Sequence, residues 1–151
     1  MGFLGAIMLN SYSVLLLSVM LAYTYYYSEK NNRQHKLFSL MIITNIFMLI
    51  LDMLGRFDGN IGTVYPVLNC VGNFAGFFFN PVLPSLWLIY AYTQTHRESR
   101  IKKSLLYIIF LVFMANAATL IVSQFTGILY TIDENNIYHR SRWFWVASAY
   151  I

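Results

Sequence analysis

Charged side chains are scarce in this sequence. Only 11% of its 151 residues are Asp, Glu, Lys or Arg, whereas a soluble globular domain carries about 25%. Hydrophobic residues make up 58%, so too little charge is present to cover a water-facing surface of this size, and a disordered chain is excluded as well. The one cysteine, Cys70, cannot form an internal disulfide, which excludes a disulfide-stapled secreted scaffold. The composition indicates an integral membrane protein.

Four apolar windows are long enough to cross a bilayer, which takes about 20 residues. These windows are residues 3–27, 37–54, 67–92 and 104–125. Asp52 is the only charged residue inside them. A fifth run, residues 143–151, is too short to cross, and we interpret it as a truncated helix. We expect an all-α membrane protein, in which residues 1–151 form an antiparallel bundle of four complete spans plus a truncated fifth.

The basic residues predict the orientation of these spans. Seven of the ten lie in two loops on one side of the bundle, residues 28–36 and 95–103, and this side should be cytoplasmic. They are Lys30, Arg33, Lys36, Arg97, Arg100, Lys102 and Lys103. The N-terminus is then outside, and we expect a multi-pass protein of the inner (plasma) membrane. Nucleic acid is not an expected partner, because these residues lie in short turns against the membrane.

Polar residues line one face of the third window. Asn69, Gly72, Asn73, Gly76 and Asn80 follow helical spacing. The second window carries a matching stripe that includes Asn45, Asp52 and Arg56. At a rise of about 1.5 Å per residue, Asp52 lies level with Asn73 and Asn45 with Asn80. We therefore expect the two helices to pack antiparallel through these stripes.

The stripes have two interpretations. Asn45, Asn69, Gly72, Gly76 and Asn80 are typical of helix packing, since small residues allow close approach and asparagine bonds across the contact. The alternative to packing is that the stripes line a ligand or signal site formed by Asp52, Arg56 and Asn73. An ionisable residue within a span is a functional hypothesis by default, but Arg56 stands four residues after Asp52, where a structural ion pair is the alternative.

Pro81 and Pro84 predict a kink in the inner half of the third window. Each proline removes a backbone donor, so the carbonyls of Phe77 and Asn80 need other partners. The kink is either static or a hinge that transmits motion. Catalytic and metal-binding motifs are not found, and no cofactor is expected. His35, His96 and His139 share no helix face, and we expect Cys70 to be a small buried hydrophobe.

From the third window onward the sequence resembles the N-terminal seven-helix sensor module of bacterial diguanylate cyclases (GGDEF proteins) and histidine kinases. The residues that carry this resemblance are the run Asn80-Pro81-Val82-Leu83-Pro84-Ser85-Leu86-Trp87-Leu88-Ile89-Tyr90, the run 125–130 and the aromatic segment 138–146. The run 136–140 is most similar to members that carry a cyclic-di-GMP synthase domain. The resemblance implies a cytoplasmic output domain and further helices that are absent from these residues.

The first functional hypothesis is therefore a sensory input region. It implies the lipid bilayer, a small-molecule or membrane signal, and a homodimer formed through the parent protein. The chain itself should catalyse nothing, while the parent would be a diguanylate cyclase or, next, a histidine kinase. The alternative is a transporter or channel subunit, and a third possibility is an intramembrane enzyme. The sequence beyond Ile151 distinguishes these classes.

Overall fold

The computed structural model describes the 151-residue chain apart from residues 1–2, 28–31, 61, 96–100 and 146–151. Most described residues are helical. The helices are α1 (Phe3–Tyr27), α2 (Arg33–Leu54), α3 (Tyr65–Phe79), α4 (Val82–Thr95) and α5 (Lys103–Thr126), and two short strands follow, β1 (Tyr130–Ile132) and β2 (Tyr138–Arg140). Lys30, His96, Arg97 and Arg100 lie outside the described residues.

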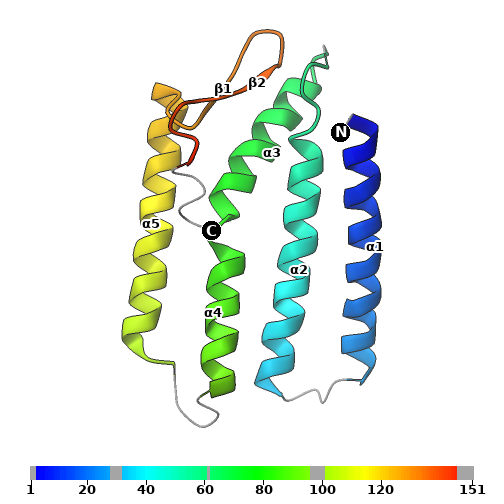
Figure 1. The fold of residues 1–151 in the computed structure, drawn as a ribbon, viewed down its shortest axis with the longest axis vertical. Helices are drawn as coiled ribbons and strands as arrows, with labels where there is room; N and C mark the ends of the chain where they lie inside the picture. Colours follow the sequence, from blue (N-terminus) through cyan, green and yellow to red (C-terminus); the bar gives the residue numbers. More distant parts are fainter. Residues whose placement is uncertain (1–2, 28–31, 61, 96–100, 146–151) are drawn as a thin grey trace.

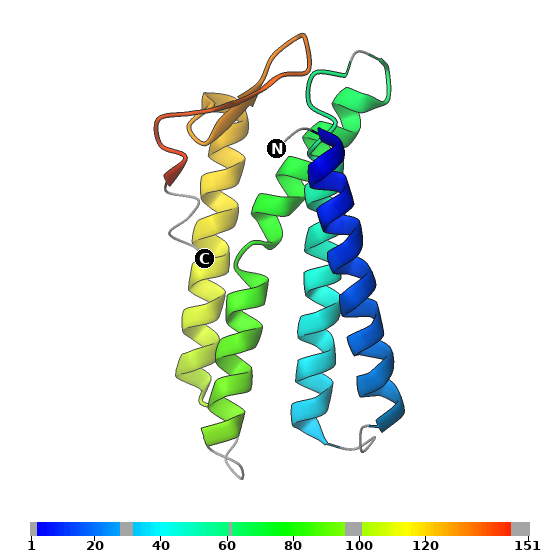
Figure 2. The same cartoon turned by 45° about the vertical axis from the view of Figure 1, so that its right-hand side comes forward.

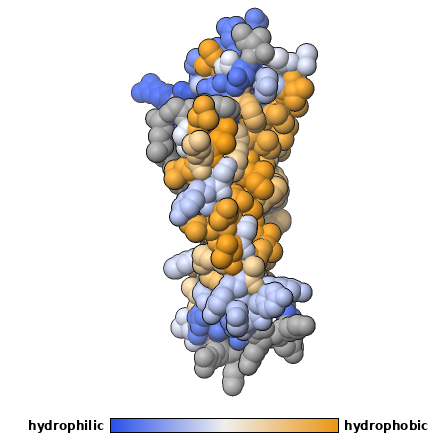
Figure 3. Space-filling model, turned by 90° about the vertical axis from the view of Figure 1, so that its right-hand side faces the viewer, coloured by the Kyte–Doolittle hydropathy of each residue, from blue (hydrophilic) through white to orange (hydrophobic). Residues whose placement is uncertain are grey.

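The described residues contain four helical segments that are long and apolar enough to cross a membrane. These segments are Leu4–Tyr27, Arg33–Leu54, Tyr65–Thr95 and Lys103–Thr126. They confirm the membrane-type helical character that the composition indicates. The space-filling view of the α1 side agrees, because an apolar belt separates hydrophilic ends (Figure 3).

The helices stand side by side in a single row, in the order α1, α2, α3 with α4, then α5 (Figures 1 and 2). Neighbours along the row run antiparallel. At one end along the helix axes, here called the hairpin end, lie the two strands and the connection between α2 and α3. The other, the basic end, carries the starts of α2 and α5, with Arg33, Lys36, Lys102 and Lys103.

The second helix begins earlier than the sequence predicted. It starts at Arg33 rather than at Leu37, so Arg33 and Lys36 lie in the first helical turn and not in a loop. The reason is a local cap: the side chain of Asn32 accepts the backbone N–H of Gln34 at 3.0 Å, which satisfies a donor that the helix leaves unpaired.

The third span is broken rather than merely kinked. α3 ends at Phe79 and α4 begins at Val82, with the buried Pro81 between them. Asn116 of α5 donates its side-chain N–H groups to the carbonyls of Phe77, at 3.0 Å, and Phe78, at 3.2 Å. A side chain from a neighbouring helix thus replaces the backbone donor that Pro81 lacks, as the membrane interior requires.

The polar segment after α5 forms a β-hairpin, which the sequence did not predict. Tyr130 pairs with Arg140 and Ile132 with Tyr138 in an antiparallel ladder. The Tyr130 ring stacks between Phe77 of α3, at 5.3 Å between centroids, and Tyr138, at 5.4 Å. Because Tyr130 belongs to a buried cluster with Leu120 and Leu129, the hairpin packs against the C-terminal halves of α3 and α5.

Two further expectations need comment. Cys70 is exposed rather than buried: it lies on α3 one residue after the fully buried Asn69 and lines an open pocket with the end of α5 and with β1. The truncated helix expected over residues 143–151 falls mostly outside the described residues. Of its first residues, Trp143 and Phe144 form a turn, and the rings of Trp143 and Trp145 lie 6.0 Å apart.

Candidate functional site

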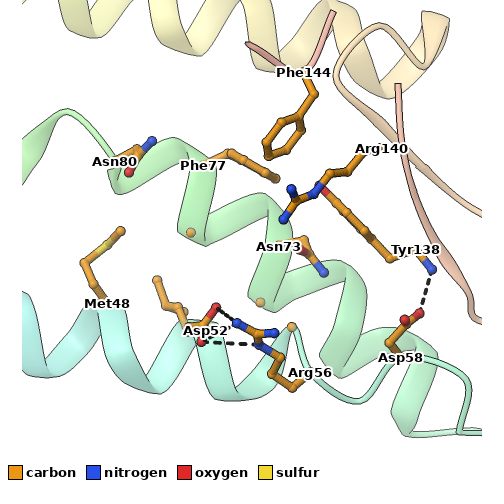
Figure 4. Close-up of a pocket in the computed structure, with 14 residues that line it drawn as sticks. Met48, Asp52, Arg56, Asp58, Asn73, Phe77, Asn80, Tyr138, Arg140 and Phe144 are labelled. Carbon is orange, nitrogen blue, oxygen red and sulfur yellow. Dashed lines mark hydrogen bonds and ion pairs between the residues drawn. The ribbon is translucent and has the colours of Figure 1, made fainter. Parts of the chain in front are cut away.

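A cavity of about 400 Å³ lies at the hairpin end, between α2, α3 and the chain around β2 (Figure 4). It is lined by Met48, Leu51, Asp52, Gly55, Arg56, Asp58, Gly72, Asn73, Gly76, Phe77, Asn80, Tyr138, Arg140 and Phe144. All three residues predicted for a ligand or signal site, Asp52, Arg56 and Asn73, face it. The stripes on the second and third windows therefore meet around a cavity as well as through a contact.

Asp52 lies in the last turn of α2 and has two partners. Arg56, one turn further on, lies 3.3 Å from it, as the i, i+4 spacing predicts. Asn10 of α1 donates its side-chain N–H to Asp52 Oδ2 at 2.7 Å, a contact that the sequence analysis missed. The side chains of Asp52 and Arg56 are 47% and 51% exposed, so this pair is not sealed in the interior.

The two glycines of α3 have different surroundings. A Cβ atom added to Gly72 would lie 2.8 Å from Leu54 Cβ and closer still to the backbone nitrogen of Gly55. Gly72 therefore stands at the point where α2 and α3 touch, the close approach that small residues allow. A Cβ atom added to Gly76 would meet nothing within 4 Å, so Gly76 contributes open space to the cavity wall.

A chain of hydrogen-bonded asparagines leads from the cavity to the hairpin. Asn73 donates to Asn69 Oδ1 at 2.7 Å, and Asn69, which is fully buried, donates to Asn136 Oδ1 at 2.8 Å. Asn136 in turn donates to the carbonyls of Phe57, at 2.7 Å, and Asn60, at 3.1 Å. Asn69 thus binds the hairpin loop rather than α2. The network fastens the turn between β1 and β2 to the α2–α3 connection.

The strand β2 brings a second arginine to the cavity. Its first residue, Tyr138, donates its backbone N–H to Asp58 Oδ1 at 2.6 Å. Side chains alternate along a strand, so Tyr138 and Arg140 face the cavity while His139 points away and lies 3.1 Å from Asp133. Burial raises the pKa of Tyr138 to about 12, although the nearby Arg140 lowers it, so this phenol is neutral at physiological pH.

A second, more apolar cavity of about 600 Å³ lies deeper between α1, α2 and α4. Asn45 and Asn80 both line it, together with Pro84. This placement agrees with the expected level of Asn45 and Asn80. Asn80 lines both cavities and stands beside the break at Pro81, so the two cavities share a wall residue where the third span is interrupted.

The described residues contain no group of three His, Cys, Asp or Glu side chains able to hold a metal ion. The groups that line the cavity can bind a ligand by hydrogen bonds, charge and ring contacts: they are two arginines, two carboxylates, asparagine amides and aromatic rings. No protein-family model, curated protein or solved structure matches the chain.

Proposed function

We propose that this chain is the membrane-embedded sensory input region of a bacterial signal-transduction protein. The parent protein is in first place a diguanylate cyclase and in second place a histidine kinase, and it acts as a homodimer in the inner membrane. In this proposal the basic end is cytoplasmic, by the positive-inside rule, and the hairpin end is outside.

One observation carries the proposal: the cavity wall and the break in the third span are the same stretch of chain. Phe77 and Asn80 line the cavity. The carbonyl of Phe77, which the break leaves without a backbone donor, accepts a hydrogen bond from Asn116 of α5 at 3.0 Å. A ligand that fills the cavity contacts the last turn of α3 directly. If its affinity differs between two positions of that turn, it shifts the equilibrium between them, and α4 carries the change to the basic end.

A transporter or channel subunit is the competing function. Transporters place their sites at interrupted helices near the bilayer midplane, often in a pair related by an internal repeat. Within the described residues the interruption at Pro81 has no counterpart in α1, α2 or α5. The ionic side chains of the 400 Å³ cavity also lie towards the hairpin end, and only the inner wall of that cavity reaches the break. Both features favour a sensor.

The test begins with the coding sequence beyond Ile151. A cyclase parent predicts a soluble domain with a glycine-glycine-acidic-acidic turn, and a kinase parent predicts a histidine-bearing helical hairpin followed by a nucleotide-binding domain. Output activity of the full protein is then compared between wild type, Asp52→Asn and Glu134→Gln at equal abundance. Glu134 is an exposed loop acid outside the cavity, so its variant controls for loss of one charge.

We expect Asp52→Asn to change the output and Glu134→Gln to leave it unchanged. Equal output from all three proteins would contradict a sensory role for the cavity. The orientation is tested separately by an impermeant thiol reagent in a Cys70→Ser background. In intact cells a cysteine at Asn135 should react and a cysteine at Asn32 should not.

A further inference from the structure

Arg140 is the cavity arginine that has no acidic partner among the described residues. Its guanidinium lies over the ring of Phe144, 4.6 Å from the centroid, and points into the cavity (Figure 4). Within the described part of the chain no carboxylate lies at ion-pair distance from it, whereas Arg56 on the opposite wall is paired with Asp52. The Tyr138 hydroxyl also accepts from this guanidinium, which carries five N–H donors, so others remain for an anion.

Both acids that line the cavity are already engaged. Asp52 accepts from Arg56 and from Asn10, and Asp58 accepts the backbone N–H of Tyr138 at 2.6 Å. Only Asp52 is paired with a cation, and neither acid lies at ion-pair distance from Arg140. Of the two cavity arginines, Arg140 is therefore the one whose guanidinium donors are not taken up by a carboxylate.

The wall beside Arg140 is aromatic. The rings of Phe77 and Phe144 meet edge to face, with 5.8 Å between their centroids. The open space at Gly76 adjoins Phe77 on α3, so there is room for an apolar group against that ring. A cavity of about 400 Å³ falls in the range of small-molecule sites, roughly 300–1,000 Å³.

We propose that this cavity binds a molecule that carries a carboxylate or phosphate group next to an apolar part. The anionic oxygens accept hydrogen bonds from Arg140, and the apolar part lies against Phe77 and Phe144. Charge-assisted bonds of this kind are the strong ones, and a planar guanidinium can make two of them at once. The idea that this ligand is the stimulus of a sensor rests on the proposed function. The idea that the cavity binds it does not.

The same chemistry has two sources at the membrane surface: a water-soluble organic anion or the headgroup of an anionic lipid. The two are separated by the composition of the bilayer. The chain is placed in nanodiscs of phosphatidylcholine alone and titrated calorimetrically with benzoate and with inorganic phosphate. In a second arm, nanodiscs contain phosphatidylglycerol as well, and the lipids retained by the protein are counted by native mass spectrometry.

Three variants are measured beside the wild type. Arg140→Gln removes the proposed anion contact, and we expect it to weaken binding about tenfold or more. Arg142→Gln removes the same charge two residues away, outside the cavity lining, and should change affinity by less than about twofold. Gly76→Leu fills the cavity from a position where an added Cβ meets nothing, and should weaken binding while Arg140 is kept. Thermal unfolding of each variant checks that it is folded.

Binding of benzoate or phosphate that is lost in Arg140→Gln supports a soluble ligand. Selective retention of phosphatidylglycerol that is lost in the same variant supports a lipid headgroup. Absence of binding by all three probes, or equal binding by wild type and Arg140→Gln, would overturn the proposal. Arg140-dependent binding together with an output that is unchanged in Asp52→Asn would support the binding site and contradict the sensory function. No Arg140-dependent binding together with an altered output in Asp52→Asn would contradict the ligand proposal and support the sensory function.

Discussion

The side-chain amide of Asn69 in α3 donates a hydrogen bond at 2.8 Å to Oδ1 of Asn136, which lies 67 residues further along the chain in the hairpin turn. Both side chains are buried. Asn136 has a φ of 59°, in the left-handed region that asparagine tolerates better than most residues. Together with the stacking of Tyr130 on Phe77, this contact joins the helices to the hairpin, whose second strand brings Arg140 to the same cavity as Asp52.

Replacing Asn136 should loosen the hairpin. Asn136→Ala removes the bonds to Asn69, Phe57 and Asn60 and places a less suitable residue at positive φ, so we expect a loss of about 2–4 kcal/mol in the free energy of unfolding. Asn136→Gly keeps the backbone relaxed and should cost less. Thermal unfolding in detergent measures both, with the exposed Asn135→Ala as control. If Asn136→Ala unfolds like Asn135→Ala, the network does not hold the hairpin.

The two glycines of α3 should respond oppositely to a methyl group. Gly72→Ala forces a Cβ atom into the backbone of α2, and overpacking of this kind costs about 1–3 kcal/mol. Gly76→Ala meets empty space and gains helix propensity, so its stability should stay equal or rise by up to about 1 kcal/mol. The melting temperatures of Gly72→Ala and Gly76→Ala, each compared with the wild type, test this difference. Equal melting temperatures would show that α2 and α3 do not touch at Gly72.

Asn116 and Pro81 should be coupled energetically. Asn116→Leu leaves the carbonyl of Phe77 without the donor that Pro81 also lacks, so it should destabilise the wild-type chain. In a Pro81→Ala background the helix recovers its own N–H, and Asn116→Leu should then cost about 1 kcal/mol less. A double-mutant cycle on unfolding free energies measures this difference. Strict additivity would mean that Asn116 does not replace the missing backbone donor.

The hairpin should weaken in acid. The backbone N–H of Ile137 first, and His139 next, hold the pKa of Asp133 below its ordinary value of 3.8. A carboxyl whose pKa is lower in the folded state stabilises that state above the ordinary pKa, and the contribution is lost as the pH falls through the folded value. Amide exchange in the hairpin should therefore be steady from neutral pH to about 4, after allowance for intrinsic rates, and accelerate below 3.8. Asp133→Asn should flatten this profile and Glu134→Gln should not.

The sequence was most informative for features that depend on neighbours along the chain. Apolar windows predicted the membrane-length helices, and the i, i+4 spacing of Asp52 and Arg56 predicted their contact, although the cap at Asn32 was missed. Of the features that depend on distant residues, the contact between α2 and α3 was predicted, and the hairpin and the contact of Asn10 were missed. β1 and β2 are three residues each and leave little periodicity to detect, and Asn10 carries no local sign that it meets Asp52.

Asparagines were the ambiguous residues. Asn69, Asn116 and Asn136 are all buried and all bridge segments far apart in sequence, yet only Asn69 lay in a recognisable stripe. An asparagine alone does not say whether it caps a backbone, joins two helices or faces a ligand. The freed carbonyl of Phe77 was predictable from Pro81, and the donor that satisfies it was not.

The proposed sensory function requires that a change in the cavity, such as loss of the Asp52 charge, alters the geometry of the basic end. Spin labels at Tyr25→Cys of α1 and Thr95→Cys of α4, both exposed near that end, report the distance between these helices in a Cys70→Ser background in nanodiscs. We predict that Asp52→Asn moves the distance distribution by about 1–2 Å, the size of helix shifts in known switches, while Glu134→Gln leaves it unchanged. Superimposable distributions for the wild type and both variants would contradict the account.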